Sequence, residues 1–475
     1  MKNKGLANLN FKWLLSALLV IFVFESSCLA NKPLTEEMVL ASAHAYYPLI
    51  KVAQSQVRVA QANYMKAKGN FDPTIRSDLI GSAIGTYQNT FSRTEISIPI
   101  SDSGSHFFTG YRIGGGNFPV YQQDRETYDL GEVNAGIEFP LFRDKEIDPR
   151  RAEIEESQLR SKMSRQEQRL VELQIKRDAA INYWIWYAEG KKLNIYKILL
   201  AVAQKRQNAL QKSIASGDLP KADSYDNERL ILQRRALVTN QQAIFQAAAK
   251  TLSLYYRDKK GKPIVVDADD LPNELVVRQN NNLKLTNLGE IAEKTPVMQK
   301  LKIERAISNV QLSLAKNNLL PLLNSRIYVA QDFGGGSPPL NRTSINYQLT
   351  FQWSLFQRSA KGQIEAAQAV LDKNRYEQQL EKERTLTDIQ STLAQLKAAY
   401  RVIYLNFKQL KLALTVQAVE ETRFKSGESS LFILNEREVI TAQTQSEYIT
   451  SLQAYYIERA NLLFFIGRMS NSIQK

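Results

Sequence analysis

Two segments of the chain alternate between apolar and polar residues. In residues 344–356, polar uncharged residues separate a row of apolar ones: Ile345, Tyr347, Leu349, Phe351, Trp353 and Leu355. Residues 133–141 alternate in the same way. A period of two places one set of side chains on each face of a strand. One face of segment 344–356 is apolar and partly aromatic, and the segment is longer than the roughly 9–11 residues that a strand needs to cross a bilayer. Both features favour a transmembrane strand over a strand of a soluble sheet.

Most of the remaining chain has the period of a helix. Residues 143–215 and 357–425 each predict a helix of roughly 100 Å. The second of them carries apolar residues at alternating spacings of three and four, which is typical of a coiled-coil seam. These residues are Leu386, Ile389, Leu393, Leu396, Tyr400, Ile403, Phe407, Leu410 and Leu414.

Shorter helical segments supply partners for the two long helices. Residues 222–257 and 430–467 predict helices that return antiparallel to the long ones, each covering about half of its partner. Residues 49–69 and 297–319 have a suitable length to stack end to end with the returning helices. We therefore expect long antiparallel coiled coils with a second layer of short helices.

The same order of elements occurs twice, which indicates an internal duplication. The separation of Pro48 and Pro73 in the first copy equals that of Pro296 and Pro321 in the second. Each copy contains a short helix, a strand region, a long helix, a Ser-Gly turn and a returning helix. A unit of this size is too long for a solenoid repeat.

This interpretation divides the chain into successive parts. They are a first structural repeat at 31–257, an equatorial linker at 258–285 with a strand-like stretch at 263–266, a second repeat at 286–467 and a C-terminal tail at 468–475.

The number of strands predicts an oligomer. Each copy has room for about two membrane strands, so the chain offers about four. Four strands cannot close a barrel, and lipid does not tolerate an open sheet edge. We therefore expect an α+β membrane protein whose strands join those of other copies in a shared barrel. The strand region of the first copy is longer, and its extra segment, residues 87–126, fits either an enlarged outer loop or an extra hairpin.

Residues 1–30 fit a cleaved export signal. A basic start is followed by an apolar run at 13–24 that is too short to span a bilayer, and then by small residues up to Ala30. Cys28 leaves a second interpretation open, in which it becomes a lipidated N-terminus, although Glu25 lies where such signals normally have an aliphatic residue. Because Cys28 is the only cysteine, cleavage after Ala30 leaves a chain without disulfides.

Composition argues against an enzyme and against nucleic-acid binding. The net charge is +14, but the basic residues are interleaved with glutamates along predicted helices, as on an ordinary solvated face. The two histidines, His44 and His106, lack metal-ligand spacing. The glycine runs at 114–116 and 334–336 lead into no helix with the Lys-Ser/Thr of a phosphate-binding loop. We expect no catalysis, no cofactor and no nucleic-acid partner.

The duplicated layout resembles the TolC family of outer-membrane efflux proteins over residues 34–467. The pieces that carry the resemblance are residues 423–431 (Arg-Phe-Lys-Ser-Gly-Glu-Ser-Ser-Leu), the Leu-Phe pairs that end the strand regions, and the prolines after the short helices. The resemblance implies a homotrimer with a shared 12-stranded β-barrel in the outer membrane and a periplasmic tunnel of helices, an α-barrel. It also implies an exit duct of a tripartite efflux or type I secretion system, whose partners are a periplasmic adaptor, an inner-membrane pump and outer-membrane lipid.

The resemblance also assigns sites. The Ser-Gly turns would lie at the periplasmic tip, where the adaptor docks, and the corresponding residues are Ser216, Gly217, Leu219, Ser426, Gly427, Glu428 and Leu431. Family members close the tip with acidic rings and a polar network, and the matching positions here are Asp223, Phe424, Ser429, Ile433 and Glu436. Ile433 stands where a second acidic residue is often found, so the resemblance implies a single acidic ring on this turn, formed by Glu436.

Two other classes of protein remain as alternatives. A periplasmic adaptor would have one helical hairpin with flanking β-domains, whereas this sequence predicts two copies of each part. A purely structural exported coiled coil leaves the alternating apolar strands unexplained.

Overall fold

The computed structural model describes residues 33–217, 220–272, 287–336, 340 and 342–468. The predicted export signal at 1–30 and Leu219 lie outside the described residues. So do residues 273–285 of the predicted linker and 469–475 of the predicted tail.

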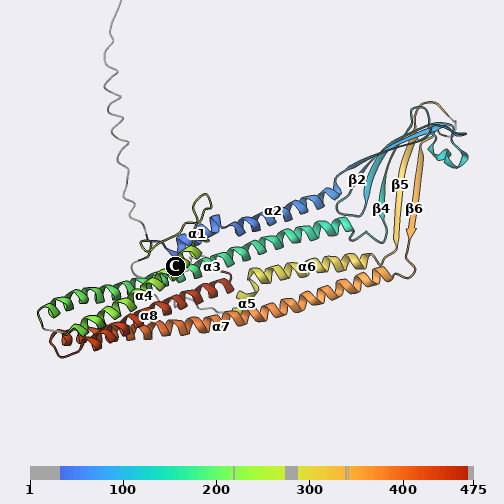
Figure 1. The fold of residues 1–475 in the computed structure, drawn as a ribbon. Coiled ribbons are helices and arrows are strands. Elements are labelled where there is room, and N and C mark those ends of the chain that lie inside the picture. Colours follow the sequence, from blue (N-terminus) through green and yellow to red (C-terminus); the bar gives the residue numbers. More distant parts are fainter. Residues whose placement is uncertain (1–32, 218–219, 273–286, 337–339, 341, 469–475) are drawn as a thin grey trace, which may run out of the picture.

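The helices form an elongated body with the sheet at one end (Figure 1). Helices α3 (Pro149–Ala215) and α7 (Arg358–Lys425) run its length, and α4 (Lys221–Ser253) and α8 (Leu431–Phe465) return beside them. Near the sheet, α2 (Pro48–Lys68) packs on α3, and α6 (Pro296–Asn317) packs on α7. The predicted pairing of long, returning and short helices is thus confirmed. Of the described helices, none is long and apolar enough to cross a membrane.

Local signals in the sequence set the starts of these helices. Asp148 caps α3 by accepting hydrogen bonds from the backbone N–H groups of Arg150 and Arg151. Prolines occupy the first positions of α2, α3 and α6, where a missing N–H costs nothing. Ser430 caps α8 through the N–H of Ile433.

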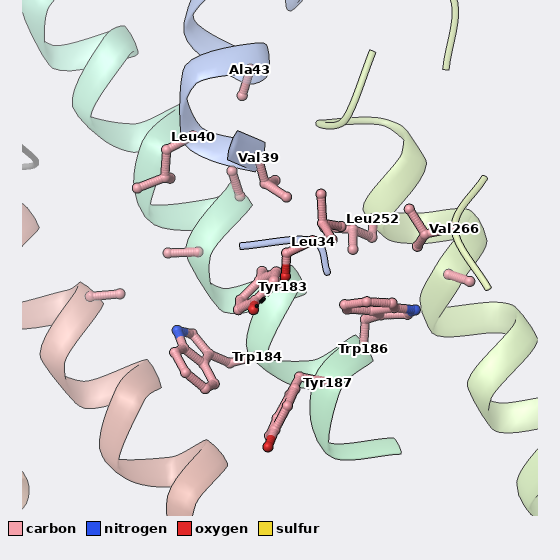
Figure 2. Close-up of a cluster of buried hydrophobic side chains, with 14 of the residues drawn as sticks. Leu34, Val39, Leu40, Ala43, Tyr183, Trp184, Trp186, Tyr187, Leu252 and Val266 are labelled. Atoms are coloured by element: carbon pink, nitrogen blue, oxygen red, sulfur yellow. Dashed lines mark hydrogen bonds between the residues drawn. The ribbon is translucent and has the colours of Figure 1, made fainter. Parts of the chain in front are cut away.

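An aromatic core holds the first and second halves of the chain together. Helix α1 (Glu36–Tyr46) and the residues before it cover α3, where Tyr183 donates a 3.0 Å hydrogen bond to the carbonyl of Leu34 (Figure 2). From the same helix, Trp184 stacks on Tyr456 of α8 with ring centroids 3.5 Å apart. These contacts fix α3 against both α1 and α8 by direct packing.

A second core follows the predicted seam of α7. Ile389, Leu396 and Ile403 are buried against α8 residues that include Leu452 and Tyr455. The short helix α5 (Leu288–Glu293) also packs on this side through Leu288 and Ile291. The spacing of three and four along α7 therefore predicted the correct face of the helix.

The sheet has six antiparallel strands in the order in which they occur along the chain, so the expected number of four is wrong. The strands are β1 (Thr74–Ser82), β2 (Asn89–Pro99), β3 (His106–Gly116), β4 (Glu132–Pro140), β5 (Leu322–Asp332) and β6 (Ser344–Gln352). Segment 87–126 is an extra hairpin, β2–β3, followed by the short 3₁₀ helix η2 (Val120–Arg125). Small polar residues such as Thr90, Ser92 and Thr94 interrupt the apolar face of β2 and hide its period.

The described part of the predicted linker contains no regular strand. Residues 263–266 were expected to be strand-like, but within residues 258–272 only the single bridge between Arg257 and Pro263 forms. Val266 is instead buried in the aromatic core, so its apolar character reflects packing between loop and helix.

Candidate functional site

The two Ser-Gly turns lie together at the end of the body that is distant from the sheet (Figure 1). Gly217 and Gly427 adopt φ values of +86° and +79°, the left-handed region that reverses a helix. A Cβ atom on either glycine would meet nothing within 4 Å, so backbone conformation alone calls for glycine. At the second turn, the N–H groups of Gly427 and Glu428 close the end of α7 by donating to the carbonyls of Phe424 and Arg423.

The other predicted tip residues are placed around these turns. Ser216 and Ser426 precede the glycines and hydrogen-bond back to the last turns of α3 and α7. Leu431 is the first residue of α8. The described residues of the two turns therefore lie side by side at this end of the body (Figure 1).

Most of the predicted gate residues line one cavity of about 860 Å³ between the tips of the two hairpins. Asp223 of α4, Phe424 of α7, and Ser429 and Glu436 of the second hairpin all contribute to its wall. Ile433 is not part of this lining. The structure thus brings together four of the five residues chosen from the resemblance.

A buried charge cluster, which sequence reasoning missed, lies next to this cavity. Glu438 of α8 accepts a hydrogen bond from the Nη2 of Arg234 at 2.9 Å, and its other carboxylate oxygen pairs with Arg206. Arg234 also donates to the carbonyl of Leu199 at 2.8 Å. Arg234 is 1% exposed and Glu438 is 5% exposed. The cluster joins α3 and α4 of the first hairpin to α8 of the second.

Burial and the charge of Glu438 act in opposite directions on Arg234. Burial lowers the pKa of Arg234, and the hydrogen bond and charge of Glu438 oppose that shift. Two guanidinium groups share one carboxylate, so removal of Glu438 would leave the buried Arg234 and the partly buried Arg206 close together without it. A signal for this cluster was present, because Arg234 follows Asn227 and Leu230 at helical spacing on the buried face of α4.

At the opposite end, every described strand has one uncharged face. Residues paired directly across an antiparallel sheet share a face. The strand registers place Ile96, Phe107, Ile137, Ile327 and Tyr347 on the same face, and all are exposed. No residue of β1–β6 on this face is charged. The predicted alternation therefore extends across the whole sheet.

The other face of the sheet carries paired charges. Arg326 of β5 bonds Glu95 of β2 at 2.9 Å and Glu138 of β4 at 3.4 Å, and it covers the ring of Phe108 at 3.6 Å from the centroid. Arg112 of β3 pairs with Glu132 of β4, with a 2.7 Å bond from its Nε. These bridges cross between strands and tie the extra hairpin to β4 and β5.

The loop between β3 and β4 folds onto this charged face. A Cβ on Gly114 would lie 1.9 Å from the carbonyl oxygen of Arg125, so the loop backbone directly covers the strand. Arg112 donates to the carbonyl of Asp124 at 2.8 Å, and the N–H of Tyr128 donates to Asp332 of β5 at 3.0 Å. We call residues 117–131 the mouth loop. It spans β3 to β5 at the outer end of the sheet.

Among the described residues, no group of His, Cys, Asp or Glu side chains could hold a metal ion.

No model of a known protein family matches the sequence, and no curated protein matches it. Solved structures do match. The open-state MtrE outer membrane channel of Neisseria gonorrhoeae has a TM-score of 0.66 at 14% identity, and the match covers 91% of this chain and 89% of that chain. The outer membrane protein VceC of Vibrio cholerae has a TM-score of 0.63 at 12% identity, with 91% and 96% covered.

A third solved structure, CusC, is described by its conformational changes on folding and transmembrane channel formation. It has a TM-score of 0.62 at 14% identity, and the match covers 91% of this chain and 92% of that chain. The chain therefore has the fold of outer-membrane channels of the TolC type, as the sequence layout predicted. MtrE, VceC and CusC are proteins that it resembles in fold at identities of only 12–14%.

Proposed function

We propose that this chain is the outer-membrane exit duct of a tripartite efflux or type I secretion system. Three copies would form a tunnel through which substrates leave passively, with energy supplied by an inner-membrane pump. The observation that carries the proposal is the uncharged face that continues over all six strands at one end of a long helical body. Such a face suits the acyl chains of a membrane.

The proportions of the molecule support this role. A helix of 68 residues such as α7 is roughly 100 Å long, so the helical body would extend far from a membrane that holds the sheet. The turns at Gly217 and Gly427 would meet the adaptor at the end of the helical body that is distant from the sheet. A periplasmic adaptor is not favoured, because the described residues form two helical hairpins and one sheet instead of one hairpin with flanking β-domains.

The cavity at the tip supports a gate at that end. Glu436 and Asp223 both line it, and in a trimer copies of each would surround the axis and repel one another. Cations would be attracted to such a ring, and closure would limit the flow of ions.

Conductance of purified protein in planar lipid bilayers tests the proposal. We expect small, cation-sensitive currents from the wild type and altered currents from Glu436→Ala. Glu228→Ala is the matched control, because Glu228 is exposed on α4 and outside the cavity lining. Absence of channels in material shown to be folded and inserted would contradict the proposed duct. Unchanged currents in Glu436→Ala would contradict only the proposed gate.

A further inference from the structure

The width of the sheet matches the width of the helical body. Near the sheet the helices lie side by side in the order α2, α3, α6, α7. At the usual helix spacing of 8–10 Å, four of them occupy roughly 32–40 Å. A strand spacing of about 4.8 Å and a tilt near 40° give each strand roughly 6 Å of circumference, so six strands occupy roughly 38 Å. Four strands would occupy only roughly 25 Å.

The extra hairpin has the same two faces as the rest of the sheet. Ile96 and Ile98 of β2 and Phe107 and Tyr111 of β3 are exposed on the uncharged side. Glu95 lies on the charged side, where it bonds Arg326 of β5. Water on the uncharged side of this hairpin would leave a large apolar patch exposed, so the hairpin belongs in the membrane with its neighbours.

The two edges of the sheet are complementary. Strands β1 and β6 have nine residues each and lie at opposite ends of the strand order. Since the sheet is antiparallel and has an even number of strands, β1 leads away from the helices and β6 leads back to them. An edge β1 and an edge β6 of two copies can therefore pair antiparallel with their uncharged faces on the same side.

We propose that β1 of one copy pairs with β6 of the next, and that three copies close a barrel of eighteen strands, six from each. The occupant of each sheet edge is thus a second copy of this chain, and the extra hairpin is part of the wall. Such a barrel has a diameter of roughly 35 Å, against roughly 24 Å for twelve strands at the same tilt. This inference rests on the proposed function and changes the size of the membrane pore.

Nitroxide labels on single cysteines test whether the hairpin lies in the wall. The label is placed in turn at Phe107→Cys of β3, at Tyr347→Cys of β6 on the same face, and at Gln348→Cys of β6 on the opposite face, with Cys28 replaced by serine. We expect the labels at positions 107 and 347 to be accessible to oxygen dissolved in lipid. The label at position 348 is expected to be accessible to a water-soluble nickel complex.

The outcomes separate this inference from the proposed function. A label at position 107 in water while the label at position 347 is in lipid would overturn the eighteen-stranded barrel and leave the duct intact. Labels at positions 107 and 347 both in water, in folded protein, would contradict the duct itself.

Disulfide formation between copies tests the pairing of the edges. Asp78→Cys in the middle of β1 is combined with cysteine at residue 344, 346, 348 or 350 of β6, which lie on the same face of the sheet. We expect one combination to give linked chains on mild oxidation, since paired strands bring Cα atoms within the reach of a disulfide. The control is Asp78→Cys with Arg93→Cys, whose Cα atoms are partners within one chain. Linking in the control but in none of the four β6 combinations would overturn the proposed edge pairing.

Discussion

At the scale of single residues, two glutamates of α8 differ in their burial and in their partners. Sequence reasoning selected Glu436, which is exposed, whereas the carboxylate that joins the two hairpins is Glu438. The two residues lie two positions apart on α8, and only their burial distinguishes their roles.

Glu438→Ala would leave the buried Arg234 and the partly buried Arg206 without their shared carboxylate. We expect a loss of about 3–5 kcal/mol per chain, because an uncompensated buried charge is costly. Thermal unfolding followed by the helical circular-dichroism signal measures this effect, and bilayer recordings show whether the tip opens more readily.

A triple variant controls for the size of that loss. Replacing Arg206, Arg234 and Glu438 together by Met, Met and Leu removes every charge, so unfolding close to the wild-type temperature is expected. If the triple variant is as unstable as Glu438→Ala, lost packing would explain the effect better than electrostatics.

Gly427→Ala should destabilise the tip by about 1 kcal/mol, because alanine is strained at a φ of +79°. The matched control is Gly362→Ala inside α7, where the added Cβ also meets nothing within 4 Å. That control should stabilise by about 0.5–1 kcal/mol through helix propensity. Shifts of the same sign in the two unfolding temperatures would contradict this account.

Glu36 of α1 predicts a pH dependence. Burial raises its pKa above the ordinary value of 4.5, against the attraction of Arg459. A carboxyl with a raised folded pKa gains a proton on folding, so its contribution to stability is complete below pH 4.5 and is lost as the pH rises through the folded value. The unfolding temperature of the wild type, measured relative to that of Glu36→Gln, should therefore rise as the pH is lowered from 7.5 to 4.5. The exposed Glu155 of α3 provides the control, Glu155→Gln, because it is not among the groups that shift the pKa of Glu36, and an equal gain against it would contradict the assignment.

At the scale of elements, the extra hairpin and the mouth loop distinguish this sheet from the one expected from the sequence. The hairpin adds two strands, and the loop that follows covers the charged face from β3 to β5. In the proposed barrel their effects on the pore would oppose each other, because the hairpin would lengthen the wall while the loop would occupy space at its mouth.

Asp332→Ala removes the acceptor that holds the N–H of Tyr128 and should loosen the mouth loop. We expect higher and noisier conductance in planar bilayers. Asp78→Ala is the control, since Asp78 lies on the same face of β1 and pairs locally with Arg76. Equal conductance in the two variants would show that the loop does not limit flow.

At the scale of the whole molecule, the proposed position in a membrane depends on the uncharged face of the sheet. Ile137→Arg puts a charge on the uncharged face in the middle of the sheet, and we expect a cost of about 2–4 kcal/mol and poor membrane assembly. Asn134→Arg is the control on the charged face of the same strand. Recovery of both variants in outer-membrane fractions measures the difference, and equal recovery would contradict a lipid-facing role for Ile137.

Local chemistry by itself determined much of this protein. The period of three and four along α7, the prolines at the helix starts and the glycines at the two turns depend on neighbours within a few residues, so they were readable from the sequence. The turns also bring four of the five residues chosen for the gate to one cavity, while their role as a gate stays a prediction.

Tertiary structure decided the rest. The number of strands, the salt bridges of Arg326 and the burial of Glu438 depend on contacts between residues that are distant in sequence. A threonine or glycine on a strand does not reveal which face of the sheet it occupies. The burial of a glutamate on a helix depends on neighbours that only the tertiary structure brings to it. Pairing and packing select among the many arrangements that the same local pattern allows, so they emerge only in the folded chain.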